Sequence, residues 1–220
     1  MAKRIAIANQ KGGCGKTTAS INIAGCLANG KADVLLVDAD PQGSAMRWRS
    51  VNTDGDLPFQ VIAIPSPVLH KEIEGLAKKY DYVLIDCPPG GPTGTDNITR
   101  SALLAVDLVI VPLQPSPFDL WSGEDMAALI KRAEGVNADL QARVLISRRV
   151  GNTALGRQAR EAAAAFDMPI FNTEIAQRIA LAEAVLAGQT IVQYAPASRA
   201  CEEFKELTKE IVACLRKSAS

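Results

Sequence analysis

The segment NQKGGCGKTT, residues 9–18, indicates the fold before any other part of the chain. It follows a short aliphatic run, RIAIA, and a helical pattern begins at Thr17 and stops at Gly30. Its three glycines let backbone N–H groups curl around an anion, because no Cβ atom stands in the way. The positive end of the following helix points at the same place. A strand, a glycine-rich loop and a helix in this order predict a phosphate-binding loop.

This loop departs from the usual pattern, G-x-x-x-x-G-K-[ST], at its first position. Five places before Gly15 stands Gln10 instead of a glycine, and Lys11 follows where an ordinary loop needs no lysine. The rest of the pattern is intact, so we expect Lys16 to pair with the β- and γ-phosphate oxygens and Thr17 to bind Mg²⁺. The loop residues predicted to bind the nucleotide are Gly12, Gly13, Cys14, Gly15, Lys16, Thr17 and Thr18.

Aliphatic runs alternate with helical patterns along the chain. Hydrophobic residues make up 48% of it and aromatic residues only 5%, so the core must be aliphatic, which favours a parallel sheet covered by helices. We expect one α/β domain over residues 1–220, a P-loop NTPase with no helix-turn-helix domain before the loop. Its sheet should be mostly parallel and twisted, with about seven or eight strands and helices on both faces. The runs are residues 4–8, 33–40, 59–64, 82–86, 108–113 and 142–147, with a weaker seventh at 168–171.

Composition excludes several classes of function. The formal net charge is +0, so any contact with nucleic acid or an anionic membrane must use a local patch. The five cysteines form no C-x-x-C pair and there is a single histidine, which argues against a zinc site and favours reduced thiols in a cytosolic protein. The N-terminal apolar run is too short for a signal peptide, and no stretch approaches the ~20 apolar residues of a membrane span.

Carboxylates end two of the predicted strands. LLVDADPQ ends with Asp38 and Asp40, and YDYVLIDCPPG ends with Asp86 before a Pro-Pro-Gly turn. Open α/β sheets bind ligands at the carboxyl ends of their strands. Mg²⁺ and an attacking water both need carboxylates there. These three residues are therefore predicted to serve the metal and the water, with Thr17 as a further metal ligand.

The motifs KGGCGKTT, VDADPQGS and LIDCPPG resemble the deviant Walker A, switch I and Walker B of the ParA/MinD family of ATPases. The similarity continues through LVIVPLQPSPFDLWS to IALAEAVLAGQTIVQYAPAS, and so covers nearly the whole chain. The resemblance implies ATP and Mg²⁺ as cofactors and a weak ATPase that a partner stimulates. It implies that Lys11 binds the nucleotide of a second subunit, that Asp38 and Asp86 serve the metal, and that Asp40 orients the water. The implied catalytic residues are Lys11, Lys16 and Asp40; Gln114 is a candidate coupling residue.

Branches of this family differ in what the switch controls. The nitrogenase iron protein needs paired surface cysteines, and no second cysteine suits Cys87. Dethiobiotin synthetase-like enzymes need a small-molecule pocket, and the sequence shows no second set of an acid, a base and a nucleophile to serve one. MinD-like members end in a basic amphipathic helix, whereas here only Arg216 and Lys217 are basic near the end. No membrane is therefore expected, although a MinD-like membrane-associated ATPase stays the alternative.

Small ParA-type proteins remain the favoured branch. The resemblance implies a homodimer that binds non-specific DNA in the ATP state, and a ParB-like or cargo-adaptor protein that stimulates hydrolysis. It implies a cytoplasmic, nucleoid-associated protein that partitions a plasmid or chromosome or positions protein cargo. Adenine contacts are expected at the ends of LISRR and QYAPAS. The candidate DNA contacts are Arg148, Arg149, Arg157, Arg160 and Arg178.

Overall fold

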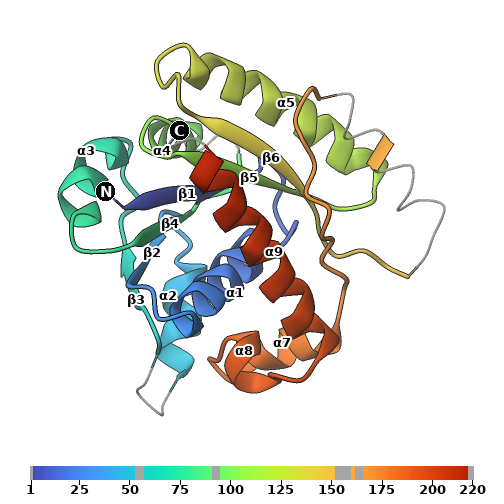
Figure 1. Ribbon diagram of the computed structural model, residues 1–220. Coiled ribbons are helices and arrows are strands. Elements are labelled where there is room, and N and C mark those ends of the chain that lie inside the picture. Colours follow the sequence, from blue (N-terminus) through green and yellow to red (C-terminus); the bar gives the residue numbers. More distant parts are fainter. Residues whose placement is uncertain (1, 53–56, 91–94, 152–159, 162–165, 218–220) are drawn as a thin grey trace.

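A parallel sheet of six strands forms the centre of the computed structural model, which describes residues 2–52, 57–90, 95–151, 160–161 and 166–217 (Figure 1). The strand order is β3-β2-β4-β1-β5-β6, and every neighbouring pair is parallel. The first strand of the sequence is thus central, which brings the loop after it to the middle of the carboxyl edge. The strands are β1 (Lys3–Ile7), β2 (Val34–Asp38), β3 (Gln60–Ala63), β4 (Tyr82–Asp86), β5 (Leu108–Leu113) and β6 (Gln141–Ile146).

The expected count of seven or eight strands is corrected to six in the described part of the chain. Residues 168–171 approach β6 but form only an isolated bridge, between Val144 and Ile170. Pro169 has no N–H to donate to a longer ladder. The segment therefore lies along the edge of the sheet without becoming a strand of it.

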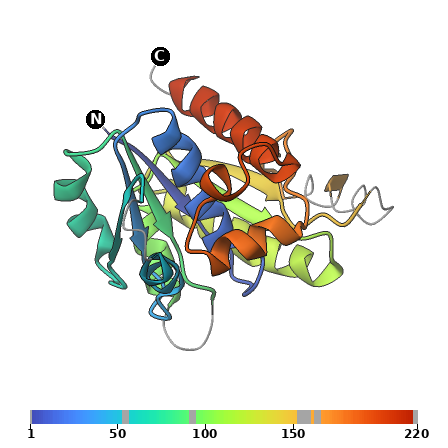
Figure 2. The ribbon, with the colours of Figure 1, turned by 90° about the horizontal axis from the view of Figure 1, so that it is seen from below.

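Helices cover both faces of the sheet, as expected. The helices are α1 (Lys16–Asn29), α2 (Ser44–Val51), α3 (Leu69–Ala77), α4 (Asp96–Leu103), α5 (Pro117–Glu134), α7 (Ile179–Leu186), α8 (Ile191–Tyr194) and α9 (Arg199–Lys217). One core packs α1, α2, α7, α8 and α9 on the sheet, and the other packs α3, α4 and α5 on the opposite face. Figure 2 shows α9 and α5 on opposite sides of the sheet.

Successive side chains along each strand point alternately into these two cores. In β1, Ile5 and Ile7 face the core under α1 and α9, whereas Ala6 faces the other core. Because both faces are buried, the strands are aliphatic throughout rather than alternating with polar residues. The apolar stripe of α9 packs on the first core through Phe204, Leu207, Ile211 and Leu215. Among the described helices, none has both the length and the apolar character that crossing a bilayer requires.

Candidate nucleotide-binding site

The loop between β1 and α1 has the backbone shape of an anion-binding turn. Gly13 and Gly15 have φ angles of 75° and 94°, in the left-handed region where a side chain would cause strain. Gly15 is also the N-cap of α1, so the unbonded N–H groups of that helix begin at the loop. The loop and the helix end together favour a phosphate group at this place.

Lys16 is buried at the centre of the loop. Its Nζ donates to the carbonyl oxygens of Asn9, at 3.1 Å, and of Lys11, at 2.8 Å. Both partners are neutral carbonyls of the loop itself. A buried ammonium is costly unless an opposite charge compensates it. The position of Lys16 therefore favours an anionic ligand.

Side chains from the ends of β5 and β6 hold the outer side of the loop. Gln114 Nε2 and Arg148 Nη1 each donate to the Gly13 carbonyl at 2.8 Å, and Ser147 Oγ donates to the Cys14 carbonyl at 2.7 Å. These bonds engage loop carbonyls from outside, which leaves loop N–H groups for a ligand on the inner side. The sequence interpretation placed the end of LISRR at the adenine and missed the bond of Ser147 to the loop; the position of Ser147 at the carboxyl end of β6 was the available signal.

The predicted carboxylates do come together. Asp38 and Asp86 are register partners at the ends of the adjacent strands β2 and β4, and both are buried. Asp38 accepts hydrogen bonds from the backbone N–H groups of Asp40 and Met46, at 3.2 and 2.9 Å. Asp86 Oδ1 accepts one from Ser20 at 3.1 Å, whereas Oδ2 has no hydrogen-bond partner among the described residues. Two like charges are thus placed side by side in a dry environment.

Burial perturbs both of these carboxyl groups. Burial is the main cause that raises the pKa of Asp86 to about 7; the charge of Asp38 adds to it, and Thr17, Ser20 and Lys16 offset part of it. Burial also raises the pKa of Asp38, against backbone N–H groups that lower it. A divalent cation would relieve both effects, because it favours the ionised forms.

These residues fit Mg²⁺ rather than a metal held by protein alone. Within the described ranges no group of three His, Cys, Asp or Glu side chains is placed to hold a metal ion. Mg²⁺ instead keeps several waters and takes one or two protein groups together with substrate phosphates. The unpartnered Oδ2 of Asp86 and the neighbouring Thr17 hydroxyl suit that arrangement.

A cavity of about 1140 Å³ opens beside the loop. At its polar end it is lined by the loop, Thr18 and Asp40. Its other end is largely apolar, with Leu145, Ile175, Ala176, Ile179 and Leu181 among the residues that line it. An anion-binding end and an apolar end suit a nucleotide, with its phosphates and its base.

Expected adenine contacts can be compared with this lining. The end of LISRR reaches the cavity through Ser147 and Arg148, whereas residues 193–198, QYAPAS, are not among the described residues that line it. The apolar residues of the lining come instead mainly from the segment just before α7 and from α7 itself, with Ile175, Ala176, Ile179 and Leu181 among them. The signal for this wall was the buried apolar pair Ile175 and Ala176 just before α7, to which the sequence interpretation gave no role.

Gln10 fills the position where the usual loop has glycine, and it contacts the Pro-Pro-Gly turn. Gly90 N donates to the Gln10 carbonyl at 2.8 Å. The Gln10 amide also lies over Gly90, so a Cβ atom at Gly90 would be 1.3 Å from Gln10 Oε1. The turn after β4 is therefore fitted to the start of the phosphate loop, a contact that sequence spacing did not indicate.

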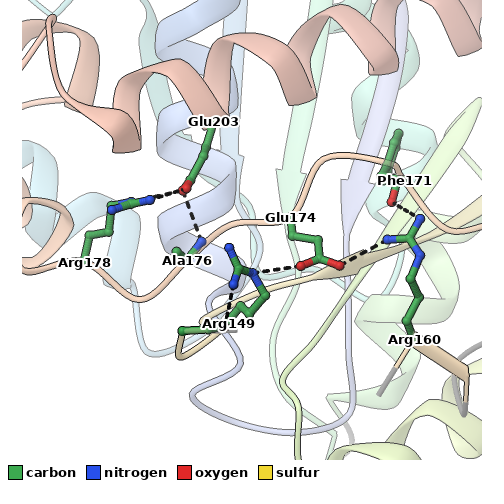
Figure 3. Close-up of polar contacts among 8 residues, drawn as sticks. Arg149, Arg160, Phe171, Glu174, Ala176, Arg178 and Glu203 are labelled. Carbon is green, nitrogen blue, oxygen red and sulfur yellow. Dashed lines mark hydrogen bonds and ion pairs between the residues drawn. The ribbon is translucent and has the colours of Figure 1, made fainter. Parts of the chain in front are cut away.

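The candidate DNA-binding arginines that the structure describes divide between the nucleotide cavity and a surface outside it. Arg149 and Arg160 both reach Glu174, and Arg178 pairs with Glu203 on α9 (Figure 3). Arg148 and Arg178 line the nucleotide cavity, while Arg149 and Arg160 do not. Arg157 lies outside the described residues. Each described arginine therefore has a partner within the chain, and DNA binding by them stays a prediction.

Comparisons with known proteins agree with this geometry. Residues 5–191 match the family model described as the CobQ/CobB/MinD/ParA nucleotide binding domain. The maintenance of carboxysome distribution protein A of Halothiobacillus neapolitanus is 31% identical over 212 residues, covering 94% of this chain and 95% of that protein. The chromosome-partitioning ATPase Soj of Thermus thermophilus is 34% identical over 245 residues, covering 96% of each.

Solved structures show the same fold. The septum site-determining protein MinD of Pyrococcus horikoshii, complexed with Mg-ADP, superposes with a TM-score of 0.76 at 23% identity, over 96% of each chain. A Cyanothece McdA variant in complex with ATP superposes with a TM-score of 0.77 at 19% identity, again over 96% of each chain. At these identities the likeness concerns the arrangement of strands and helices.

Proposed function

Because the chain belongs to the CobQ/CobB/MinD/ParA family of nucleotide-binding domains, whose ParA and MinD members are ATPases, we propose that it is a ParA-type ATP switch. In this proposal ATP and Mg²⁺ join two copies of the chain, and the dimer binds DNA without sequence preference. A partner protein stimulates hydrolysis and so returns the dimer to monomers. The switch would partition DNA or position protein cargo on the nucleoid in the cytoplasm.

The observation that supports this most is the buried pair Asp38–Asp86 beside Lys16 and Thr17. The lysine and the carboxylates are bonded to neutral groups of the chain. A bound phosphate would therefore neutralise the charge of Lys16, and a metal ion would neutralise the carboxylates. Thr17, Asp38 and Asp86 would hold Mg²⁺, which supplies charge neutralisation to the phosphates. Lys16 would bind the β- and γ-phosphates from the opposite side.

Asp40 is the residue that we propose to orient the attacking water. It lines the cavity just after β2 and is half-buried rather than enclosed. Its Oδ1 accepts a hydrogen bond from Gln42 N at 2.9 Å, and its carbonyl accepts one from Gly43 N at 2.9 Å, so the turn fixes its position. An ionised carboxylate held in this way can accept a proton from water.

Lys11 is proposed to act across the dimer interface. Its backbone is fixed from both sides, because its N–H donates to Asn9 Oδ1 at 3.1 Å and its carbonyl binds Lys16 Nζ. The backbone from which the Lys11 side chain extends is thus held within the loop. A cation supplied to the partner's phosphates would make dimerisation depend on the triphosphate.

Dimerisation tests the proposal directly. We expect the wild-type protein to elute as a dimer in light-scattering chromatography with a non-hydrolysable ATP analogue and Mg²⁺, and as a monomer with ADP. Asp40→Ala should remain dimeric in ATP itself, because it binds but does not turn over. Lys11→Ala should bind nucleotide and stay monomeric. A wild-type protein that stays monomeric when saturated with the analogue would contradict the switch.

Binding to DNA distinguishes the proposal from its alternative. The same nucleotide states should be pulled down with plasmid DNA and with anionic liposomes. The ParA-type proposal requires ATP-dependent capture by DNA that weakens steeply with salt, since phosphate contacts release counterions. ATP-dependent capture by liposomes alone would favour the MinD-like, membrane-associated alternative, with the end of α9 near Arg216 as the contact to test.

A further inference from the structure

Glu174 lies between two arginines on a surface outside the nucleotide cavity. Its Oε2 is 2.8 Å from Arg149 Nε, and its Oε1 is 3.2 Å from Arg160 Nη1 (Figure 3). None of the three side chains lines the cavity, although the residues that follow Glu174 do. Two guanidinium groups therefore converge on the two oxygens of one carboxylate.

The ion pairs of Glu174 are weak enough for another anion to displace the carboxylate. The side chains are partly exposed, at 27% for Arg149, 38% for Arg160 and 24% for Glu174. Arg149 Nε approaches the carboxylate but makes no hydrogen bond of good geometry within the described structure. Ion pairs of this exposure contribute about 0–1 kcal/mol to stability. A phosphate of a DNA backbone carries one negative charge and two free oxygens, as the carboxylate does, and arginine binds either group by bidentate bonds.

Main-chain bonds fix the segment around Glu174 independently of its carboxylate. Ile175 N donates to the Ile146 carbonyl at 2.9 Å, Arg149 N to the Ile175 carbonyl at 3.0 Å, and Gln177 N to the Arg149 carbonyl at 3.0 Å. The cavity wall formed by these residues is thus attached to β6 by its backbone. The side chain of Glu174 can lose its partners while the wall stays in place.

We propose that Glu174 is an internal competitor that covers a phosphate-binding pair formed by Arg149 and Arg160. The carboxylate occupies the point on which the two arginines converge, which is where one phosphate of a DNA backbone would sit. A DNA phosphate then binds only by displacing Glu174, so the carboxylate keeps the affinity of this surface low. The proposal rests on the proposed function, because it takes DNA as the polyanion.

Neutralising Glu174 tests this inference. We would measure the anisotropy of a labelled duplex of arbitrary sequence with the full chain, Mg²⁺ and a non-hydrolysable ATP analogue. At about 0.15 M salt, Glu174→Gln should bind about 5- to 10-fold more tightly than wild type. Its slope of log affinity against log salt should be steeper by about 1 to 2, one for each arginine released.

A matched control separates this effect from a simple change in charge. Glu206→Gln makes the same charge change at an exposed ion pair with Lys209 and should stay within about two-fold of wild type. Adding Arg149→Gln and Arg160→Gln to Glu174→Gln should remove the gain. Unchanged affinity for the ATP analogue checks that the variant is folded. If it is not folded, the double variant Arg149→Gln/Arg160→Gln in the wild-type background must keep the salt slope of wild type, because covered arginines make no phosphate contacts; a shallower slope would overturn the inference.

The results of these binding experiments distinguish failure of the inference about Glu174 from failure of the proposed function. If wild type binds DNA in the ATP state but Glu174→Gln matches Glu206→Gln, the inference is overturned and the proposed function stands. If wild type forms the dimer and neither it nor any variant binds DNA, the DNA-binding part of the proposed function fails and the inference fails with it. Binding by Glu174→Gln alone would support the covering role of the carboxylate most directly.

Discussion

The phosphate loop and the Glu174 surface both gather charged residues, but they satisfy those charges differently. At the loop, Lys16 is bonded to carbonyl groups and Asp38 to N–H groups, so each formal charge meets only neutral partners. At the other surface, Arg149 and Arg160 meet an opposite charge from the same chain. A charge that is bonded to neutral groups is prepared for a ligand, whereas a charge that is already paired must first be released.

Removing the cation of the loop should give the largest effect. We expect Lys16→Ala to weaken ATP binding by at least about 1000-fold, because a buried charge-assisted contact to the phosphates is lost. A fluorescent ATP analogue titrated into the protein measures this. Lys209→Ala removes an exposed lysine on α9 and serves as control, with no change expected. Retained affinity in Lys16→Ala would mean that the cavity does not bind phosphates at the loop.

The shifted pKa of Asp86 should give the next largest effect, on stability. Its pKa is raised to about 7 in the folded protein, from 3.8, so between these values the folded state binds a proton that the unfolded state has lost. Stability without nucleotide should therefore fall as pH rises, by at most about 1.4 kcal/mol per unit and by slightly more than about 2 kcal/mol from pH 5 to pH 7, and level off above the folded pKa.

Denaturant unfolding of wild type and Asp86→Asn at several pH values measures this slope. Other groups titrate in the same window, so the informative quantity is the difference between the two proteins. The variant should lack most of the decline, and Mg²⁺ with nucleotide should reduce it in wild type because the metal favours the ionised form. Parallel pH profiles for the two proteins would show that Asp86 is not the buried proton acceptor.

The phosphate loop could be predicted because its residues are consecutive in the sequence. Contacts between residues far apart in the sequence could not be predicted. The glycines, Lys16 and Thr17 are consecutive, and Asp38 and Asp86 follow apolar strands, so a parallel sheet necessarily brings them to one edge. Ser147 and Arg148 bond loop carbonyls from more than 130 residues away. Nor did spacing reveal that Glu174 would reach Arg149. The seventh strand predicted at residues 168–171 does not form, because Pro169 has no backbone N–H to donate to a longer ladder.

Disturbing the contact between Gln10 and Gly90, at the start of the loop, should have a smaller effect on stability and ATP binding. Gly90→Ala places a Cβ atom where the Gln10 amide lies, and that amide is the far end of a flexible side chain. We expect the loop entry to shift at a cost of about 1 kcal/mol, seen as lower stability and weaker ATP binding. Adding Gln10→Ala makes room again, so the double variant should recover part of the loss. A double variant worse than either single one would place the strain elsewhere.

The smallest effect is expected on the surface where charges are already paired. Arg160→Gln breaks an ion pair whose arginine is more than a third exposed, so we expect a stability loss below about 1 kcal/mol. ATP affinity should not change, because Arg160 does not line the cavity. Thermal unfolding and the same fluorescent titration measure both quantities against Lys16→Ala. A fall in ATP affinity as large as that of the loop variant would mean that the two regions form one site, and the contrast between them would have to be abandoned.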